Sequence, residues 1–354
     1  MNIYLNSSSR NYFDKFPFYT PLNNYQILSI NGLDAIAFLN RQLTQDINKL
    51  NETNALFSGY CTEKGRVLAT CLLWHHKKYT SKINEDLNIY CLIRKDILPS
   101  FLKRLSIFVL RDKVKFYLPK LYVLGFVAPK KDLNKLEDII ESKLPQKSWE
   151  RSENSFGTWI ASPYTGSNFF RWWCITDTEQ FLYVEEKIGR ILSMQSKDKQ
   201  NFWHDLDLSS GLLWINLSTQ NIFTPHAVNL DLIEAISFKK GCYPGQEIIA
   251  RMHYRGIPKR RMFYGSFNKN SEIKDLTNFI GTDVINNRNS DQPCGKIVDF
   301  SEVLDSVKIL FELNLNSLPQ SANENLFLQN SGSIIKILDL PYAVPVINLR
   351  NDSK

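Results

Sequence analysis

The sequence lacks several patterns that would assign a function directly. No part of its 354 residues approaches the ~20 consecutive apolar residues that a membrane-spanning helix requires. The N-terminal stretch MNIYLNSSSRNYFDKFPFYT has no cationic start followed by an apolar run, so no secretory signal is expected. The phosphate-binding P-loop, the dinucleotide fingerprint and internal repeats are absent as well. These absences favour a soluble, cytoplasmic protein with no membrane partner.

Cysteine and histidine are sparse and scattered. The six cysteines stand singly along the chain: Cys61, Cys71, Cys91, Cys174, Cys242 and Cys294. A chain of this length does not need disulfides to be stable, so reduced thiols are expected. No zinc spacing and no Ser/His/Asp set can be argued from them or from the five histidines. We therefore predict no permanently bound metal, and leave open a cluster shared between two chains.

Positive charge is present and concentrated. The net charge is +7, and one short stretch, residues 239–261, holds seven cations against one carboxylate, Glu247. The cations are Lys239, Lys240, Arg251, Arg255, Lys259, Arg260 and Arg261. Such a patch predicts an anionic partner, either a carboxylate or phosphate ligand or RNA. A solvated cationic face explains the last three of these residues equally well.

Strands and helices alternate irregularly in the hydrophobic pattern. The predicted elements are a strand from residue 26, a helix from Asp34 to Ile47, a hairpin around 62–65, a strand over 87–93, and helices over 96–105 and 131–143. The segments 158–162, 169–175 and 181–186 favour strands. Hairpins among mixed elements indicate an α+β protein rather than a doubly wound parallel sheet.

The hydrophobic pattern of the sequence changes near residue 257. Short β runs separated by Asn, Ser and Gly follow, with little helical pattern, and predict a small C-terminal β-barrel. We therefore divide the chain into residues 1–256, taken as two intertwined α/β lobes, and residues 257–354.

One stretch, FKKGCYPGQEIIARMHYRG at 238–256, combines glycines, cations and a lone thiol. We expect a strand over 232–238, a turn shaped by Gly241 and Gly245, and then a helix. Such a turn would direct free N–H groups and lysine charge at Cys242 and stabilise its thiolate. Three functions of Cys242 follow: nucleophile, redox or persulfide carrier, and soft-metal ligand. The structural alternative is a small buried residue in a tight turn.

This stretch resembles the signature of the YgfZ family of folate-binding proteins, whose core is K-G-C-Y-x-G-Q-E. The core is complete at residues 240–247, and the flanking F-T-P, N-L, A-R and R-G pairs also match. AFLNRQLTQDINKL at 37–50 and CTEKGRVLAT at 61–70 look like the other landmark of the family. The resemblance is specific over 223–261 and looser elsewhere.

The resemblance implies a fold related to the T-protein of glycine cleavage, a tetrahydrofolate-dependent aminomethyltransferase. That fold is a three-lobed ring, with two mixed α/β lobes and a C-terminal β-barrel around a central folate pocket. The implied function is a folate-binding accessory protein that supports assembly or repair of iron–sulfur clusters in client enzymes, including one that modifies tRNA. Tetrahydrofolate or a derivative is the implied cofactor, and the iron–sulfur enzymes are the implied partners.

Carried onto this chain, the resemblance assigns Cys242 and Lys240 as the reactive pair, with Lys240 activating the thiol. The expected folate-binding residues are Phe223, Pro225, Asn229, Tyr243, Gly245, Gln246, Glu247, Arg251 and Arg255. Gln246 and Glu247 would fix the helix start or reach the ligand, and the two arginines would meet acidic groups. Tyr243 would either pack on the pterin or close the turn.

Two departures from T-proteins bear on catalysis. Their acidic pair after the hairpin is replaced by Ala69 and Thr70, and their R-x-E-A-G motif is replaced by DLSSG at 207–211. Without these carboxylates no general base is expected for aminomethyl transfer, and the pterin loses an anchor. We therefore favour a non-enzymatic role. The alternatives are a tetrahydrofolate-dependent one-carbon transferase, with tRNA as one substrate to consider, and, more weakly, direct RNA binding.

Overall fold

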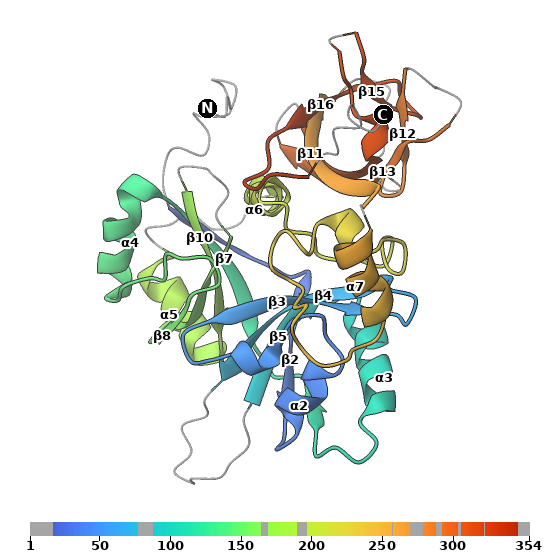
Figure 1. The fold of residues 1–354 in the computed structure, drawn as a ribbon. Coiled ribbons are helices and arrows are strands. Elements are labelled where there is room, and N and C mark those ends of the chain that lie inside the picture. The colour runs from blue at the N-terminus through green and yellow to red at the C-terminus, as the bar shows by residue number, and fades with distance from the viewer. Residues whose placement is uncertain are drawn as a thin grey trace.

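The computed structural model describes residues 17–76, 88–163, 169–189, 197–256, 258–269, 279–287, 292–303, 306–321 and 323–345. These residues form two five-stranded antiparallel sheets and a closed barrel (Figure 1). The first sheet has the order β3-β4-β5-β2-β6. Its strands are β2 (Tyr25–Asn31), β3 (Ala55–Cys61), β4 (Val67–His76), β5 (Asn88–Arg94) and β6 (Lys115–Tyr117).

The second sheet has the order β1-β7-β10-β9-β8. Its strands are β1 (Phe18–Pro21), β7 (Tyr122–Pro129), β8 (Arg151–Asn154), β9 (Gly157–Ala161) and β10 (Phe169–Thr176). Because β1 precedes the first sheet in the chain yet pairs with β7, the N-terminal part of the chain crosses between the two lobes. The lobes are therefore intertwined.

The C-terminal barrel closes in the order β11-β14-β13-β12-β15-β16. Its strands are β11 (Arg260–Asn268), β12 (Asp283–Asn286), β13 (Gly295–Val303), β14 (Ser306–Asn314), β15 (Leu326–Leu328) and β16 (Ile334–Leu338). The predicted α+β class and C-terminal barrel are confirmed. The division at residue 256 stays a prediction, although the first barrel strand begins four positions later.

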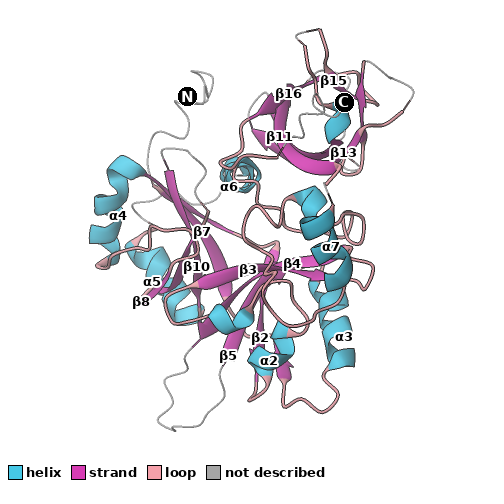
Figure 2. Ribbon diagram, viewed as in Figure 1, coloured by secondary structure: helices cyan, strands magenta, loops and turns pink. Residues whose placement is uncertain are grey.

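Helices lie around the sheets, whereas the barrel is almost entirely strand (Figure 2). The α-helices are α2 (Ala35–Asn40), α3 (Leu98–Phe108), α4 (Leu133–Ile140), α5 (Thr178–Lys187), α6 (Lys197–Ser209) and α7 (Gln246–Arg255). Four single-turn 3-10 helices are η1 (Ile47–Lys49), η2 (Lys130–Asp132), η3 (His226–Val228) and η4 (Leu315–Ser317). Figure 1 places α6 between the lobes and the barrel, and α7 below the barrel on the side of the first sheet.

Tryptophan side chains join the two sheets into one core. Trp173 of β10 contacts Trp214 and Trp203, with ring centroids 6.0 and 5.8 Å apart, and Trp214 contacts Phe57 of β3 at 5.1 Å. All three tryptophans are fully buried. Edge-to-face packing of large rings contributes both buried area and a defined geometry. The relative position of the two lobes is therefore fixed by side chains distant in sequence.

Three predicted elements differ in the structure. The helix expected to reach Ile47 ends at Asn40, because Leu43 forms an isolated bridge with Tyr60 instead. Residues 181–186 are helical in α5, whose capping box between Asp177 and Gln180 was not recognised in the sequence. Residues 232–238 form turns and irregular chain, not a strand.

Candidate functional site

The thiol-bearing loop, residues 239–245, leads directly into α7 and rests on the β3–β4 hairpin. Gly245 precedes the helix with φ +81°, and a Cβ at this position would lie 2.5 Å from the carbonyl oxygen of Thr62. Only glycine fits such a conformation against the neighbouring backbone. Gly241, in contrast, has open space around it. The predicted helix after the turn is confirmed, and the second glycine of the motif is needed for its close approach to the hairpin.

Lys240 anchors this loop to the segment that follows α2. Its Nζ donates hydrogen bonds of 2.7 Å to the carbonyl oxygens of Leu43 and Gln45 and lies 5.2 Å from the centre of the Tyr243 ring. Burial lowers the pKa of Lys240 to about 8, against a smaller opposing effect of Asp46. The ammonium thus has structural partners of its own. Activation of Cys242 by Lys240 stays a prediction.

Cys242 differs from the other cysteines in exposure. It is exposed, whereas the other five thiols are buried. Burial raises the pKa of Cys61 and Cys174 well above the usual range, and that of Cys294 to about 11. Buried, protonated thiols are poor nucleophiles and are inaccessible to a partner. The alternative that Cys242 is a small buried turn residue is therefore wrong.

The other predicted site residues divide into two groups. Phe223, Pro225, Asn229 and Tyr243 are buried, and Gln246 is half-buried, whereas Glu247, Arg251 and Arg255 lie on the exposed face of α7. Asn229 has φ 58° and donates from Nδ2 to the carbonyl oxygen of Met262 at 2.8 Å. It thereby joins the loop before the motif to the barrel. Folate binding by these residues stays a prediction.

Part of the cationic stretch, residues 239–261, is already paired with carboxylates in the structure. Arg261 is 4% exposed and forms two hydrogen bonds with the Asp231 carboxylate, at 2.6 and 3.0 Å. Arg260 pairs with Glu312 at 2.5 Å. A solvated face is therefore the wrong explanation for Arg261, which is a core residue. The charge available to a partner comes mainly from the exposed Lys239, Arg251, Arg255 and Lys259.

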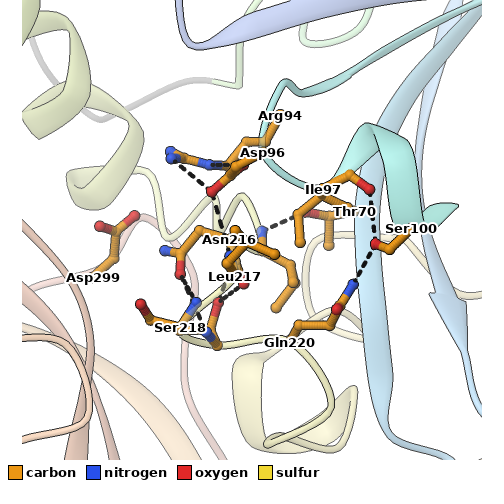
Figure 3. Close-up of polar contacts among 12 residues, drawn as sticks. Thr70, Arg94, Asp96, Ile97, Ser100, Asn216, Leu217, Ser218, Gln220 and Asp299 are labelled. Atoms are coloured by element: carbon orange, nitrogen blue, oxygen red, sulfur yellow. Dashed lines mark hydrogen bonds and ion pairs between the residues drawn. The ribbon is translucent and has the colours of Figure 1, made fainter.

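A second group of charged residues meets where the two sheets and the barrel come together. This central cluster consists of Tyr25, Arg94, Arg171, His204, Asp207 and Asp299. Arg94 donates to Asp96 at 3.1 and 3.4 Å, and Asp96 accepts from the backbone N–H of Leu217 at 3.3 Å. Figure 3 shows this network with Asp299 beside it, contributed by strand β13 of the barrel.

Two ion pairs complete the central cluster. Arg171 and Asp207 are 2.5 Å apart and almost fully buried, at 3% and 0% side-chain exposure. His204 Nε2 lies 3.1 Å from Asp299 Oδ1. Burial alone would lower the pKa of His204, but the carboxylates of Asp299 and Asp207 together outweigh it and the pKa is raised. Burial also raises the pKa of Asp207, against the opposing charge of Arg171.

The cluster holds two unsatisfied acceptors. Asp207 Oδ2 and Asp299 Oδ2 are buried and have no hydrogen-bond partner within the described residues. Buried carboxylate oxygens are normally paired, so each marks a place for a donor. A pterin ring has an edge rich in N–H groups and could supply such donors. The residues at this junction therefore fit the polar edge of a pterin.

A cavity of about 170 Å³ lies beside the cluster, lined in part by Tyr25, Arg94, Trp203 and His204, whereas Asp207 and Asp299 lie behind this lining. Pockets that enclose a whole cofactor commonly measure roughly 300–1,000 Å³. The cavity is thus large enough for a ring system and too small for a complete folate.

Little in the sequence indicates this cluster. Asp299 lies in a barrel strand, and Asp207 occupies the first position of the altered R-x-E-A-G motif. The run His204-Asp205-Leu206-Asp207 within an otherwise apolar stretch was the one available signal, because buried polar residues need partners. Thr70, which replaces a T-protein carboxylate, is engaged elsewhere: its hydroxyl donates to Leu213 O at 3.0 Å and accepts from Ile215 N at 2.9 Å.

The described residues contain no group of three or more His, Cys, Asp or Glu side chains placed to hold a metal ion. None of the described helices is both long and apolar enough to cross a membrane.

Comparison with known proteins places the chain among named relatives. No protein-family model matches it. It is 28% identical over 250 residues to the tRNA-modifying protein YgfZ of Hamiltonella defensa, covering 69% of this chain and 68% of that protein. The YgfZ protein of Buchnera aphidicola is 29% identical over 241 residues, which is 67% of this chain and 70% of that one. An uncharacterized protein of Haemophilus influenzae is 27% identical over 91% of this chain and 97% of its own length.

A solved structure supports the fold. The glycine cleavage system aminomethyltransferase T from Bartonella henselae superposes with a TM-score of 0.68, covering 92% of this chain and 86% of that chain at 14% identity. At this identity the similarity concerns the fold alone. The resemblance seen in the sequence is confirmed: the chain is a homologue of the tRNA-modifying YgfZ proteins and has the fold of aminomethyltransferase T.

Proposed function

We propose that this protein is a folate-binding accessory protein that acts through Cys242 and supports assembly or repair of iron–sulfur clusters in client enzymes, including one that modifies tRNA. The observation that carries the proposal is the exposure of Cys242 alone among six cysteines. Its loop is held by Lys240 on one side and by the close packing of Gly245 on the other. An exposed thiol on a rigid loop can reach a partner protein without unfolding.

The surroundings of Cys242 suit contact with a protein or an anionic group. Arg251 and Arg255 project from the exposed face of α7, and Lys239 is exposed at the start of the loop. Cations at the rim of an interface mainly accelerate and orient association with an acidic surface. Glu247 is the one carboxylate among them, in the first turn of α7, where the helix dipole favours it.

Tetrahydrofolate, the cofactor that the resemblance implies, would be held by its pterin ring at the central cluster. Asp207 and Asp299 would accept hydrogen bonds from the pterin edge through their unpaired oxygens. Tyr25 and Arg94, in the wall of the cavity, would orient the ring. When bound, the cofactor would supply one-carbon chemistry or simply stabilise the ring of lobes.

A folate-dependent one-carbon transferase remains a second candidate because of one observation. The sequence comparison predicted that no carboxylate would be available as a general base. Asp207 and Asp299 lie at the junction, each with one oxygen that has no partner within the described residues, and burial raises the pKa of Asp207. Turnover of a tetrahydrofolate derivative by the purified protein would favour this candidate.

The thiol part of the proposal is tested by alkylation with iodoacetamide as a function of pH. Because the other cysteines are buried, the native protein can be used without replacing them, with Cys242→Ser as the control. One thiol per chain should react. Its alkylation rate should fall in Lys240→Met, because Lys240 is expected to activate the thiol, and a bound client enzyme should also slow the reaction. A reaction that is unchanged in Cys242→Ser, or indifferent to both Lys240 and the client, would overturn the reactive role.

The folate part is tested separately by calorimetric titration with tetrahydrofolate. Asp299→Asn should weaken binding, because the amide cannot replace a carboxylate on both oxygens. Glu302→Gln, on the same strand but in a surface pair with Lys269, is the matched control and should leave the affinity unchanged. Equal affinities for the wild type and Asp299→Asn would remove folate from the central cluster.

A further inference from the structure

A larger cavity lies between α7 and the barrel, away from the central cluster. It measures about 660 Å³, within the range of pockets that hold drug-sized molecules. Its walls come from separate parts of the chain: Arg66 at the β3–β4 hairpin, Phe223 and His226 around η3, Met252 near the end of α7, Lys259 after it, and Glu312 of the barrel. We call it the α7–barrel cavity.

Cations dominate the charged residues of this cavity. Four of them, Arg66, Lys259, Arg260 and Lys296, face one carboxylate, Glu312, for a net charge of +3 (four minus one). Arg260 pairs with Glu312, and Lys296 pairs with Asp283 outside the cavity.

The remaining two cations are available to a ligand. Arg66 donates one hydrogen bond, to the carbonyl oxygen of Ile222. Lys259 is exposed, and its side chain has no partner within the described residues. A cavity with this charge balance attracts an anion.

His226 supplies an independent indication of a ligand. It is 3% exposed, lies in the cavity wall, and its Nε2 has no partner within the described residues. Burial, reinforced by Arg261 and His253 and opposed by Asp231, lowers the pKa of His226, so that it is neutral at pH 7. A buried imidazole nitrogen without a partner is costly, and a ligand atom in the cavity would satisfy it.

The apolar part of the wall defines the rest of the ligand. Phe223 is buried, and Ala227 and Met252 line the same cavity. We infer that the α7–barrel cavity binds a small organic anion whose aromatic or apolar body packs against Phe223 and Met252, whose phosphate, sulfonate or carboxylate group meets Lys259 and Arg66, and which exchanges a hydrogen bond with His226. This site is separate from the central cluster, where we place the pterin ring, although Phe223 is also one of the residues that the sequence resemblance assigns to folate.

The test uses two fluorescent probes with the same aromatic body. Anilinonaphthalene sulfonate carries an anionic group, and N-phenylnaphthylamine lacks it. The sulfonate probe should bind the native full-length protein with one site per chain and at least about ten-fold more tightly than the neutral probe, because two charge contacts distinguish them.

Three variants locate the site, and one is a control. Lys259→Gln should weaken binding of the sulfonate about five-fold or more while leaving the neutral probe unchanged. Met252→Trp should fill the cavity and abolish binding of both probes. His226→Phe should also weaken binding of the sulfonate probe, through loss of a hydrogen bond rather than loss of a charge. Lys239→Gln, an exposed cation outside the cavity, is the matched control and should have no effect.

Thermal unfolding of each variant shows whether it is folded, and Lys259→Gln, at an exposed position, carries the test if a buried substitution fails. Equal affinity for the two probes, or sulfonate binding that ignores both Lys259→Gln and Met252→Trp, would overturn the inference. Tetrahydrofolate affinity measured on the same samples should be unchanged in Lys259→Gln, which separates this result from the folate proposal.

Discussion

The thiol-bearing loop and the central cluster both contain charged residues, but in opposite environments. In the loop, Cys242 and Lys239 are exposed, and the half-buried ammonium of Lys240 is bonded to backbone carbonyls of another segment. In the central cluster, Arg171 and Asp207 are paired out of contact with water. Charges in water have small effects on stability, whereas buried charges have large ones once a partner is lost. The loop can therefore contact a partner without a large loss of stability. The cluster, in contrast, stabilises the packing of the lobes.

The strongest test of this contrast is Arg171→Met. It leaves the buried Asp207 carboxylate without its partner and should lower the free energy of unfolding by about 3–5 kcal/mol. Urea unfolding followed by tryptophan fluorescence measures the change. Lys269→Met, which removes an exposed ion pair with Glu302, is the control and should cost about 0–1 kcal/mol.

A double replacement sharpens the result. Arg171→Met together with Asp207→Leu removes both charges and should be less destabilising than Arg171→Met alone. If the single variant is as stable as the wild type, the pair does not hold the junction.

Within the motif, the two glycines should behave differently. Gly245→Ala places a Cβ against the Thr62 carbonyl oxygen at φ +81° and should cost about 2–4 kcal/mol through strain and overpacking. Gly241→Ala has open space and should change stability by less than about 0.5 kcal/mol. Differential scanning calorimetry of both variants checks this. Equal losses of stability in the two variants would show that both positions need glycine for backbone flexibility, and not for the close approach to Thr62.

Lys240→Met should lower stability by about 1–3 kcal/mol at pH 7, because the carbonyl groups of Leu43 and Gln45 lose their donor. The pH dependence of this stability difference is a second expected result. Burial lowers the pKa of Lys240 to about 8 in the folded protein, and an unfolded lysine titrates near ~10.4. Between these values the unfolded chain binds more protons, so the wild type should gain stability relative to Lys240→Met as the pH rises.

Chemical denaturation at several pH values from about 7 to about 10.5, a range that contains both pKa values, measures the difference. A constant difference across this range would mean that Lys240 is not desolvated.

The smallest expected effect is that of His204→Gln. The carboxylates of Asp299 and Asp207 together raise the pKa of His204 despite its burial, so protonated His204 stabilises the folded state. This contribution is complete below the pKa of an unfolded histidine, near ~6.5, and is lost as the pH rises through the folded value. The wild type should therefore lose stability relative to His204→Gln on going from acidic to weakly alkaline pH. The two thermal unfolding profiles should converge there, and parallel profiles would contradict the pairing.

The fold could be predicted from the sequence where the signals are local. The hairpin at 62–65, the helix after Gly245 and the barrel strands follow from glycines and from alternating apolar residues close together in the chain. The helix predicted from Asp34 to Ile47 is wrong beyond Asn40, because the bridge between Leu43 and Tyr60 depends on a strand elsewhere. The helix α5 was missed because its aromatic and β-branched residues outweighed its capping box.

The candidate site divides in the same way. The K-G-C-Y-x-G-Q-E core pointed to the YgfZ relatives and to Cys242, since all eight positions lie on one loop and one helix start. The pairing of Arg261 with Asp231, the cluster of Arg171, Asp207 and Asp299, and the α7–barrel cavity each join residues that are dozens of positions apart.

The sequence by itself determined the resemblance to the YgfZ proteins, the α+β class and a C-terminal barrel, because these depend on contiguous patterns and on a short specific motif. Only the tertiary structure decided which of the cations are buried, that Cys242 is exposed while the other thiols are not, and where unpaired carboxylate and imidazole atoms lie. Exposure and pairing depend on what the rest of the chain places against a residue. No local pattern contains that information.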